Sequence, residues 1–386
     1  MDSAEREGLR PKGNVPNLRF PEFEGEWEEE RLADIADLYK GTGISKDQLS
    51  DDGEPCILYG ELYTKYKSET IREVISKTNI DNTKLVRSKA NDVIIPCSGE
   101  TAEDIATARC VLNGNILLGG DLNIIRLHGY DGAFMSYQLN GKRKYDIAKV
   151  AQGVSVVHLY GEHLKGVKTI NPCLEEQKKI ASLLALLDER ISTQSKIIDK
   201  LQSLIKGIRN DVFGKLRKSV GFNAMISDVL SYEQPQPYIV ENTEYTAEGT
   251  PVLTANKAFV LGYTSETNGI YDKGDCIIFD DFTLDCKYVD FPFKVKSSAI
   301  KILTAKNKEL LRYTFEFLKY LDLSTEEHKR HYIAEMQNQE IILPTEQMVK
   351  TIAHIFSTLS LRMETAVKQR NVFEKQKQYL LRQMFI

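Results

Sequence analysis

The sequence predicts an α+β protein in which two globular domains are separated by two long antiparallel coiled-coil helices. Three observations lead to this fold class. Between Pro172 and Phe213, apolar residues recur at alternating steps of four and three, which is the spacing of a coiled-coil seam. This segment aligns without a gap with Pro344 to Phe385, at an offset of 172 residues. The order of short apolar runs in the first half also returns in the second. The chain is therefore predicted to be an internal duplication.

These observations divide the chain into five segments. The N-terminus is polar and contains Gly8 and Pro11, so we expect it to be disordered. A helix over the first seam would be about 63 Å long at 1.5 Å per residue. The predicted segments are a disordered N-terminus (1–14), a first globular domain (15–171), a central long helix (172–218), a second, shorter globular domain (219–343) and a C-terminal long helix (344–386).

The direction of the helix pair follows from one polar seam position, Gln194. An antiparallel pairing that sets Ile180 against Met384 places Gln194 opposite Arg370, whereas a parallel pairing places it opposite Ala366. Two polar residues that meet in one layer fix the register better than a polar residue against a methyl group. We therefore expect the helices to pair antiparallel within the chain. The alternative is that they mediate homodimerisation.

Short apolar runs bounded by turn residues predict strands in both globular domains. The stretch 53–55 (Gly-Glu-Pro) matches 249–251 (Gly-Thr-Pro) at an offset of 196, and 92–95 matches 275–278 at an offset of 183. The difference in residue number between matching segments falls to 172 at the long helices. Residues are therefore missing from the second domain, and we expect its loops to be shorter on an equivalent scaffold. A helix is expected near Phe134, and Asn307 is expected to cap its counterpart.

Composition and charge restrict the class of protein. The 386 residues are 42% hydrophobic and 27% charged, which is typical of a globular protein. No long apolar run or hydrophobic signal core is present, so we expect a cytoplasmic location. The six cysteines include no C-x-x-C pair, so we expect buried or half-buried thiols and no metal site.

The net charge of −4 is unevenly distributed. Segments 172–218 and 344–386 each carry +4, whereas 15–171 carries −5 and 219–343 carries −7. Because phosphate contacts supply most nonspecific affinity for nucleic acids, the acidic globular domains should bind a duplex poorly alone. If DNA is the ligand, a partner should contribute.

Four stretches stand out beside the helix seam: 15–23 with Trp27, the helix openings 172–181 and 342–347, and 279–283 followed by 287–293. Together they resemble the specificity subunits of type I restriction-modification enzymes. The resemblance covers nearly the whole chain after residue 14.

The resemblance implies a noncatalytic DNA reader. Each globular domain would be a target recognition domain for one half of a split site, and the helices would set the spacing between the halves. The resemblance also implies two modification (methyltransferase) subunits docked on the helices, with S-adenosylmethionine bound in those partners and no cofactor in this chain. Separate restriction subunits would cleave the DNA.

Candidate DNA-binding residues come from the distribution of basic, aromatic and amide side chains. Base edges are read by side chains in the grooves, whereas lysine and arginine on phosphates set position. In the first domain the candidates are Lys65, Tyr66 and Lys67, in a loop that interleaves aromatics with lysines, and the basic cluster Lys142, Arg143, Lys144 and Lys149. In the second domain they are Asn256, Lys257, Thr283, Lys287, Lys329, Arg330 and His331. The alternatives are ordinary exposed charges for the loop and a turn cap for Asn256.

Other functions are less well supported by the sequence. A glycine-rich nucleotide loop following a strand is absent, which argues against a methyltransferase. Asp275, Asp285 and Lys287 resemble the acid and lysine spacing of metal-dependent nucleases, but such short matches are common. The remaining alternative is a coiled-coil scaffold that organises protein partners without reading DNA.

Overall fold

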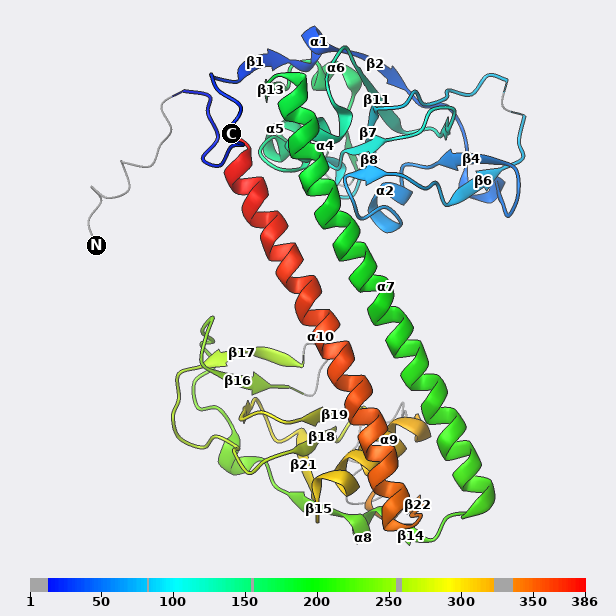
Figure 1. Ribbon diagram of the computed structural model, residues 1–386, viewed down its shortest axis with the longest axis vertical. Coiled ribbons are helices and arrows are strands. Elements are labelled where there is room, and N and C mark those ends of the chain that lie inside the picture. The colour runs from blue at the N-terminus through cyan, green and yellow to red at the C-terminus, as the bar shows by residue number, and fades with distance from the viewer. Residues whose placement is uncertain (1–12, 82, 154–155, 255–258, 323–335) are drawn as a thin grey trace, which may run out of the picture. The chain divides into compact units, whose positions relative to one another are not determined.

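The computed structural model describes residues 13–81, 83–153, 156–254, 259–322 and 336–386 (Figure 1). The chain divides into two compact units. Unit 1 comprises Met1–Gln194 and Gln369–Ile386, and unit 2 comprises Ser195–Lys368. The long helices are α7 (Leu174–Ser219) and α10 (Glu346–Met384). Each unit therefore contains a globular part and a portion of both long helices. Apart from residues 13 and 14, the segment predicted to be disordered lies outside the described residues.

The main sheet of unit 1 has five strands. Its order is β2 (Ala36–Lys40), β11 (Leu122–Leu127), β7 (Asp92–Pro96), β9 (Arg109–Val111) and β5 (Thr70–Ile71). Neighbouring strands are antiparallel except for β5 and β9. Every residue of β7 is buried, which is why this segment reads as a continuous apolar run in the sequence.

Smaller sheets and short helices complete the globular part of unit 1. One sheet has the order β10 (Leu117–Leu118), β4 (Glu54–Ile57), β6 (Ser76–Thr78) and β3 (Leu49–Ser50). Two strand pairs are β1 (Glu28–Arg31) with β13 (Lys168–Asn171), and β8 (Ser98–Gly99) with β12 (Val157–His158). The helices are α1 (Leu32–Ile35), α2 (Glu61–Thr64), α3 (Ala102–Ile105), α4 (Gly132–Asn140), α5 (Lys144–Val150), α6 (Gly161–Leu164) and the 3₁₀ turn η2 (Lys46–Gln48).

Unit 2 contains a smaller set of elements. Its main sheet has the order β15 (Leu230–Glu233), β21 (Ile300–Ala305), β18 (Cys276–Asp280) and β19 (Cys286–Val289), all antiparallel. The other strands are β17 (Val260–Thr264), β16 (Thr250–Leu253) and β20 (Lys294–Val295) in one sheet, and the pair β14 (Ala224–Met225) and β22 (Glu340–Ile341). The helices are α8 (Ile226–Val229), α9 (Lys308–Leu321) and the 3₁₀ turns η3 (Gln236–Tyr238) and η4 (Met336–Asn338).

The two units repeat one topology. The order β2-β11-β7-β9 in unit 1 corresponds to β15-β21-β18-β19 in unit 2. A four-residue helix precedes the first strand of each series, and β10 runs parallel to β4 as β20 does to β16. The expected cap of α9 is present, because the Asn307 side chain accepts a hydrogen bond from the backbone N–H of Leu310. The internal duplication is therefore confirmed at the level of topology.

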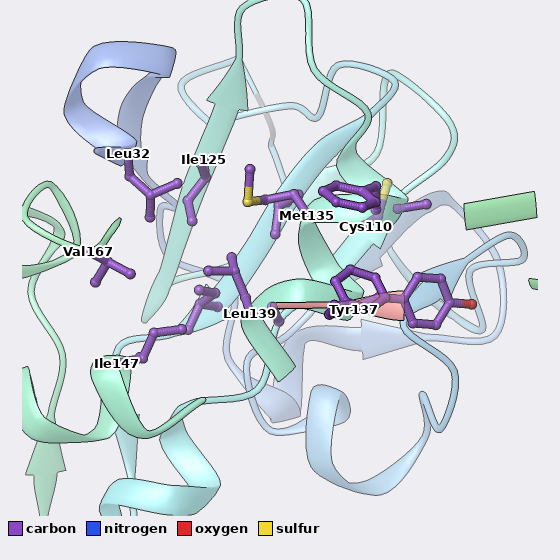
Figure 2. Close-up of a cluster of buried hydrophobic side chains, with 14 of the residues drawn as sticks. Leu32, Cys110, Ile125, Met135, Tyr137, Leu139, Ile147 and Val167 are labelled. Carbon is purple, nitrogen blue, oxygen red and sulfur yellow. The ribbon is translucent and has the colours of Figure 1, made fainter. Parts of the chain in front are cut away.

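The core of unit 1 forms around α4. Met135, Tyr137 and Leu139 of this helix lie with Ile125 of β11 and with Leu32 in one buried cluster (Figure 2). The long helices belong to the same core. Ile180 and Leu184 of α7 are buried there, and Phe385, just after α10, stacks on Phe134 with ring centroids 5.1 Å apart.

The core of unit 2 is built in the same way around α9. Phe213, near the end of α7, is fully buried and contacts Tyr313 and Phe317 of α9 at 5.4 Å between ring centroids. Ile352 and Phe356 of α10 belong to the same cluster. The ends of the long helices are therefore part of the globular cores as well as a coiled coil.

Within each unit the portions of α7 and α10 pair antiparallel. In unit 1, Lys377 donates to Asp188 at 2.6 Å, and the Arg190 guanidinium lies 5.6 Å from the Phe373 ring. In unit 2, the guanidinium of Arg209 lies 5.9 Å from the Phe356 ring. These pairs are within one residue of the register predicted from Ile180 opposite Met384.

The prediction that Gln194 and Arg370 form the polar pair that fixes this register was wrong. Arg370 lies beside Glu374 on its own helix, with Nε and Oε1 3.6 Å apart, and within the described part of the chain no hydrogen bond joins it to Gln194. Asp188 and Lys377 make the polar contact across the helices instead. The flexible side chain of a lysine can reach along the helix pair to a carboxylate. A buried ammonium group can therefore form an ion pair in such a layer.

Candidate nucleic-acid interface

The first predicted DNA-binding loop follows α2. Lys65 is exposed, but its ammonium donates to Glu61 at 2.7 Å and to Ser76 at 2.6 Å. Tyr66 is 7% exposed and belongs to a hydrophobic cluster with Leu62. Its hydroxyl oxygen accepts a hydrogen bond from the N–H of Ile75 at 3.2 Å. Tyr66 thus anchors the loop in the core and offers no accessible ring to a ligand.

Lys67 is the cation of this loop that remains available. Its side chain is exposed and its ammonium donates to the carbonyl of Tyr63 at 3.1 Å. Among the residues that the structure describes, no carboxylate lies within ion-pair distance of it. Lys67 therefore presents an uncompensated positive charge, the property that a phosphate contact requires.

The basic cluster lies between α4 and α5. Lys142 is exposed and Lys144 half-buried, and in the described part of the chain neither has an ion-pair partner. Arg143 is directed inwards: it approaches Asp146 at 3.5 Å and donates to the backbone carbonyl of Ile386 at 3.3 Å. Lys149 is exposed and lies 3.9 Å from Asp146. Lys142 and Lys144 are therefore the members best placed for a phosphate, whereas Arg143 ties the cluster to the chain end.

One groove of about 500 Å³ lies beside the basic cluster of unit 1. It is lined by Lys142, Lys144 and Tyr145 from the basic cluster and by Arg382 from α10. Glu69, two residues beyond Lys67, lines the same groove. The groove thus joins the basic cluster to Glu69 and to α10, which are remote from it in the sequence.

In unit 2 the structure describes two of the predicted residues. The hydroxyl of Thr283 donates to Asp280 at 2.6 Å, and Lys287 lies 3.1 Å from Asp285. Both residues have exposed surface, but each is already engaged by a carboxylate. The other five predicted residues, Asn256, Lys257, Lys329, Arg330 and His331, lie outside the described residues.

A buried ionic cluster beside the first loop was not predicted from the sequence. The ammonium of Lys377 donates to Glu69 at 2.5 Å and to Asp188 at 2.6 Å. Asp188 also accepts hydrogen bonds from the Tyr137 hydroxyl at 2.7 Å and from the Ser68 hydroxyl at 3.0 Å. One feature of the sequence could have indicated it: Lys377 occupies a seam position of the second helix, and the aligned seam residue of the first helix is the apolar Ile205.

The protonation states follow from the surroundings. Burial lowers the pKa of Lys377, but Glu69 and Asp188 outweigh burial, so the pKa is raised above its ordinary value and the ammonium stays charged. Burial and the Asp188 carboxylate raise the pKa of Tyr137, so its hydroxyl keeps the proton that it donates. The cluster is therefore a charged, hydrogen-bonded junction of the loop with α4, α7 and α10.

Unit 2 has a polar junction at the corresponding place. Arg312 of α9 donates to Glu316 at 2.7 Å and to the hydroxyl of Ser360, which is 172 residues after Asp188. Arg209 of α7 also donates to Glu316, at 2.7 Å. The charges are arranged differently from those in unit 1, but in both units a globular helix is fastened to the helix pair by buried polar groups.

The proposed nuclease spacing does not form a metal site. Asp275 accepts from Tyr288 and pairs with Lys308, whereas Asp285 pairs with Lys319 and Lys287. Among the described residues, no group of three or more histidine, cysteine or acidic side chains could hold a metal ion. Five cysteines are buried, as expected, and Cys173 is exposed. No helix in the described part of the chain is long and apolar enough to span a bilayer.

Comparisons with known proteins point to one family. Residues 24–203 match the family described as "Type I restriction modification DNA specificity domain". The EcoR124I/EcoR124II type I restriction enzyme specificity subunit of Escherichia coli is 45% identical over 126 residues, which cover 31% of each chain. The MjaVIII specificity subunit of Methanocaldococcus jannaschii is 28% identical over 199 residues, 51% of this chain and 44% of that protein. The matched regions thus span less than half the length of these relatives.

A solved structure has a similar fold over nearly the whole chain. The S subunit of a type I restriction-modification system from M. genitalium has a TM-score of 0.71 with 17% identity, covering 96% of this chain and 99% of that one. The predicted architecture of two globular domains and two long helices therefore corresponds to a known fold.

Proposed function

We propose that this chain is a specificity subunit of a type I restriction-modification system, because residues 24–203 match the DNA specificity domain of that family, and that it recognises DNA and performs no catalysis itself. Each globular part reads one half of a bipartite site. The paired helices set the spacing of the two halves and dock methyltransferase subunits.

The observation that carries this proposal is the repeated topology. Two globular parts share one strand order, and each is fastened to an antiparallel portion of the same two helices. A chain built from two equivalent reading domains suits a target with two separate halves. The uncompensated charges of Lys67, Lys142 and Lys144 on unit 1 support contact with phosphates.

In this proposal, partner subunits carry out the methylation and the cleavage of DNA. Two modification subunits would bind S-adenosylmethionine and methylate the DNA, and restriction subunits would join the complexes that cleave it. This chain would need no cofactor, and it would act in the cytoplasm. The acidic globular parts make the dependence on partners expected, because they repel a duplex when alone.

A selection from a random duplex library tests the proposal. The chain is purified with its modification subunits, bound to the library at fixed salt concentration, and the retained duplexes are sequenced. We expect a consensus with two short specific sequences separated by a gap of fixed length. The modification subunits without this chain are the control and should retain no consensus.

The scaffold alternative predicts a different result. A coiled-coil adaptor that only organises proteins would assemble with the subunits but would enrich no sequence. A consensus with a single uninterrupted block would contradict the two-domain reading while leaving DNA recognition intact.

A further inference from the structure

We propose that the buried cluster of Ser68, Glu69, Asp188 and Lys377 positions Lys67 for DNA contact. The inference rests on the proposed function, since it concerns how the first globular part presents its reading loop. It assigns to the helix pair a role beyond spacing, because two of the four residues belong to α7 and α10.

The first step is the anchoring of the loop before Lys67. Lys65 is held by Glu61 and Ser76, and Tyr66 is buried. The backbone carbonyl of Tyr66 also accepts a hydrogen bond from Arg109 of β9 at 3.2 Å. The chain therefore enters position 67 from a fixed point.

The second step is the anchoring after Lys67. The Ser68 hydroxyl donates to Asp188 of α7, and Glu69 accepts from Lys377 of α10. The backbone carbonyl of Glu69 accepts from the N–H of Cys110 at 2.8 Å, which joins the loop to the main sheet. Lys67 is thus an exposed residue between two anchored neighbours, so its side chain starts from a defined backbone position.

The third step concerns the chemistry of the anchor. Asp188 and Lys377 are each 9% exposed, so their hydrogen bonds are little weakened by water. Asp188 uses one oxygen for Lys377 and the other for Ser68 and Tyr137. A single carboxylate therefore joins the pairing of the two helices to the loop and to α4.

Anchoring on both sides of Lys67 preorganises its side chain for binding. A phosphate or base contact made by a fixed side chain loses less conformational entropy than one made by a mobile loop. Releasing the Ser68 anchor should therefore weaken recognition by unit 1 without removing any group that touches DNA. Ser68 would be a positioning residue, and Lys67 the residue that makes the contact.

A double-mutant cycle on the complex with its modification subunits tests this inference. Ser68→Ala removes the loop anchor and leaves the Asp188–Lys377 pair in place. Binding is measured to the selected duplex and to duplexes in which one half-site is scrambled. We expect Ser68→Ala to weaken binding about 3- to 10-fold, the range of one hydrogen bond, with the loss confined to one half-site.

The decisive quantity is the coupling with Lys67→Ala. If Ser68 acts by positioning Lys67, Ser68→Ala should have little further effect once Lys67 is alanine. Ser68→Thr, which keeps the hydroxyl, should restore binding. Ser360→Ala, at the α10 position that corresponds to Asp188, removes a hydrogen bond of unit 2 and serves as the control: it should leave binding to the half-site read by unit 1 unchanged.

The outcomes separate this inference from the proposed function. If the wild-type complex selects a split consensus but the effects of Ser68→Ala and Lys67→Ala multiply, the positioning role is refuted and DNA reading stands. An unchanged affinity in Ser68→Ala, with the wild-type melting temperature, refutes it equally. If the wild-type complex selects no sequence, the proposed function itself fails.

Discussion

Lys377 carries a positive charge into the seam between the two long helices, where an aliphatic residue is the usual occupant. Two carboxylates, Asp188 and Glu69, receive its hydrogen bonds. A buried charge is tolerated when it is paired and fully hydrogen-bonded, and it fixes register because a shifted partner would leave it unpaired. Asp188–Lys377 therefore replaces the Gln194–Arg370 pair expected from the heptad pattern.

Lys377→Met should destabilise the protein strongly. The substitution keeps the apolar stem but leaves two buried carboxylates without their cation, so we expect a loss of about 3 to 5 kcal/mol. Urea unfolding followed by circular dichroism measures it. Lys375→Met, at an exposed position of the same helix, is the control and should change stability by less than about 0.5 kcal/mol. Equal effects of the two substitutions would show that the cluster does not hold the helices together.

Lys142→Ala should lower the salt dependence of DNA binding by the assembled complex. Each phosphate contact contributes about 0.9 to the slope of log K against log salt, so the slope should fall by about one. Lys46→Ala, an exposed lysine on η2, serves as the comparison. An unchanged slope for Lys142→Ala would remove this residue from the interface.

Some of the residues discussed above could be predicted from the sequence, and others could not because they are far apart in the chain. The basic run near Lys142 is visible because its members are adjacent in the chain. The Ser68–Asp188 and Glu69–Lys377 contacts join residues 120 and 308 positions apart, so only the fold brings them together. Tyr66 was predicted to bind DNA because aromatic residues alternate with lysines in its loop, but its ring is buried in the core.

At the scale of elements, the predicted strands and helices correspond closely to the structure. The apolar run at 93–96 lies in β7, the helix near Phe134 is α4, and the Asn307 cap begins α9. Short strands such as β5 and β8 escaped prediction because two residues carry no periodicity. The coiled-coil pattern also did not reveal that Phe213 and Phe385 enter the globular cores.

Disulfide trapping tests the helix pairing directly. Arg190→Cys with Phe373→Cys, in a Cys173→Ser background, should crosslink under mild oxidation, because these side chains are in contact in unit 1. Arg190→Cys with Arg362→Cys represents the parallel register and should remain reduced. Crosslinking of the parallel pair alone, detected by gel mobility, would overturn the antiparallel arrangement. Linkage between two chains would instead support homodimerisation.

For the whole molecule, duplication links sequence to function. The offset of 172 between the long helices identified the repeat, and the falling offsets located the shorter loops of the second domain. Among the described residues, unit 2 retains the four-stranded series and has fewer small strands and helices around it than unit 1. In the proposed function, two domains with different loops on one scaffold would allow the two half-sites to differ in sequence.

The insertion of one heptad at matching layers of α7 and α10 tests the central claim most directly. Seven residues lengthen each helix by about 10.5 Å. At 3.4 Å per base pair, the gap between the half-sites should grow by about three base pairs. Selection of duplexes by the wild-type and lengthened complexes measures the change. Our account predicts the same two half-site sequences with a longer gap, and an unchanged gap would contradict it.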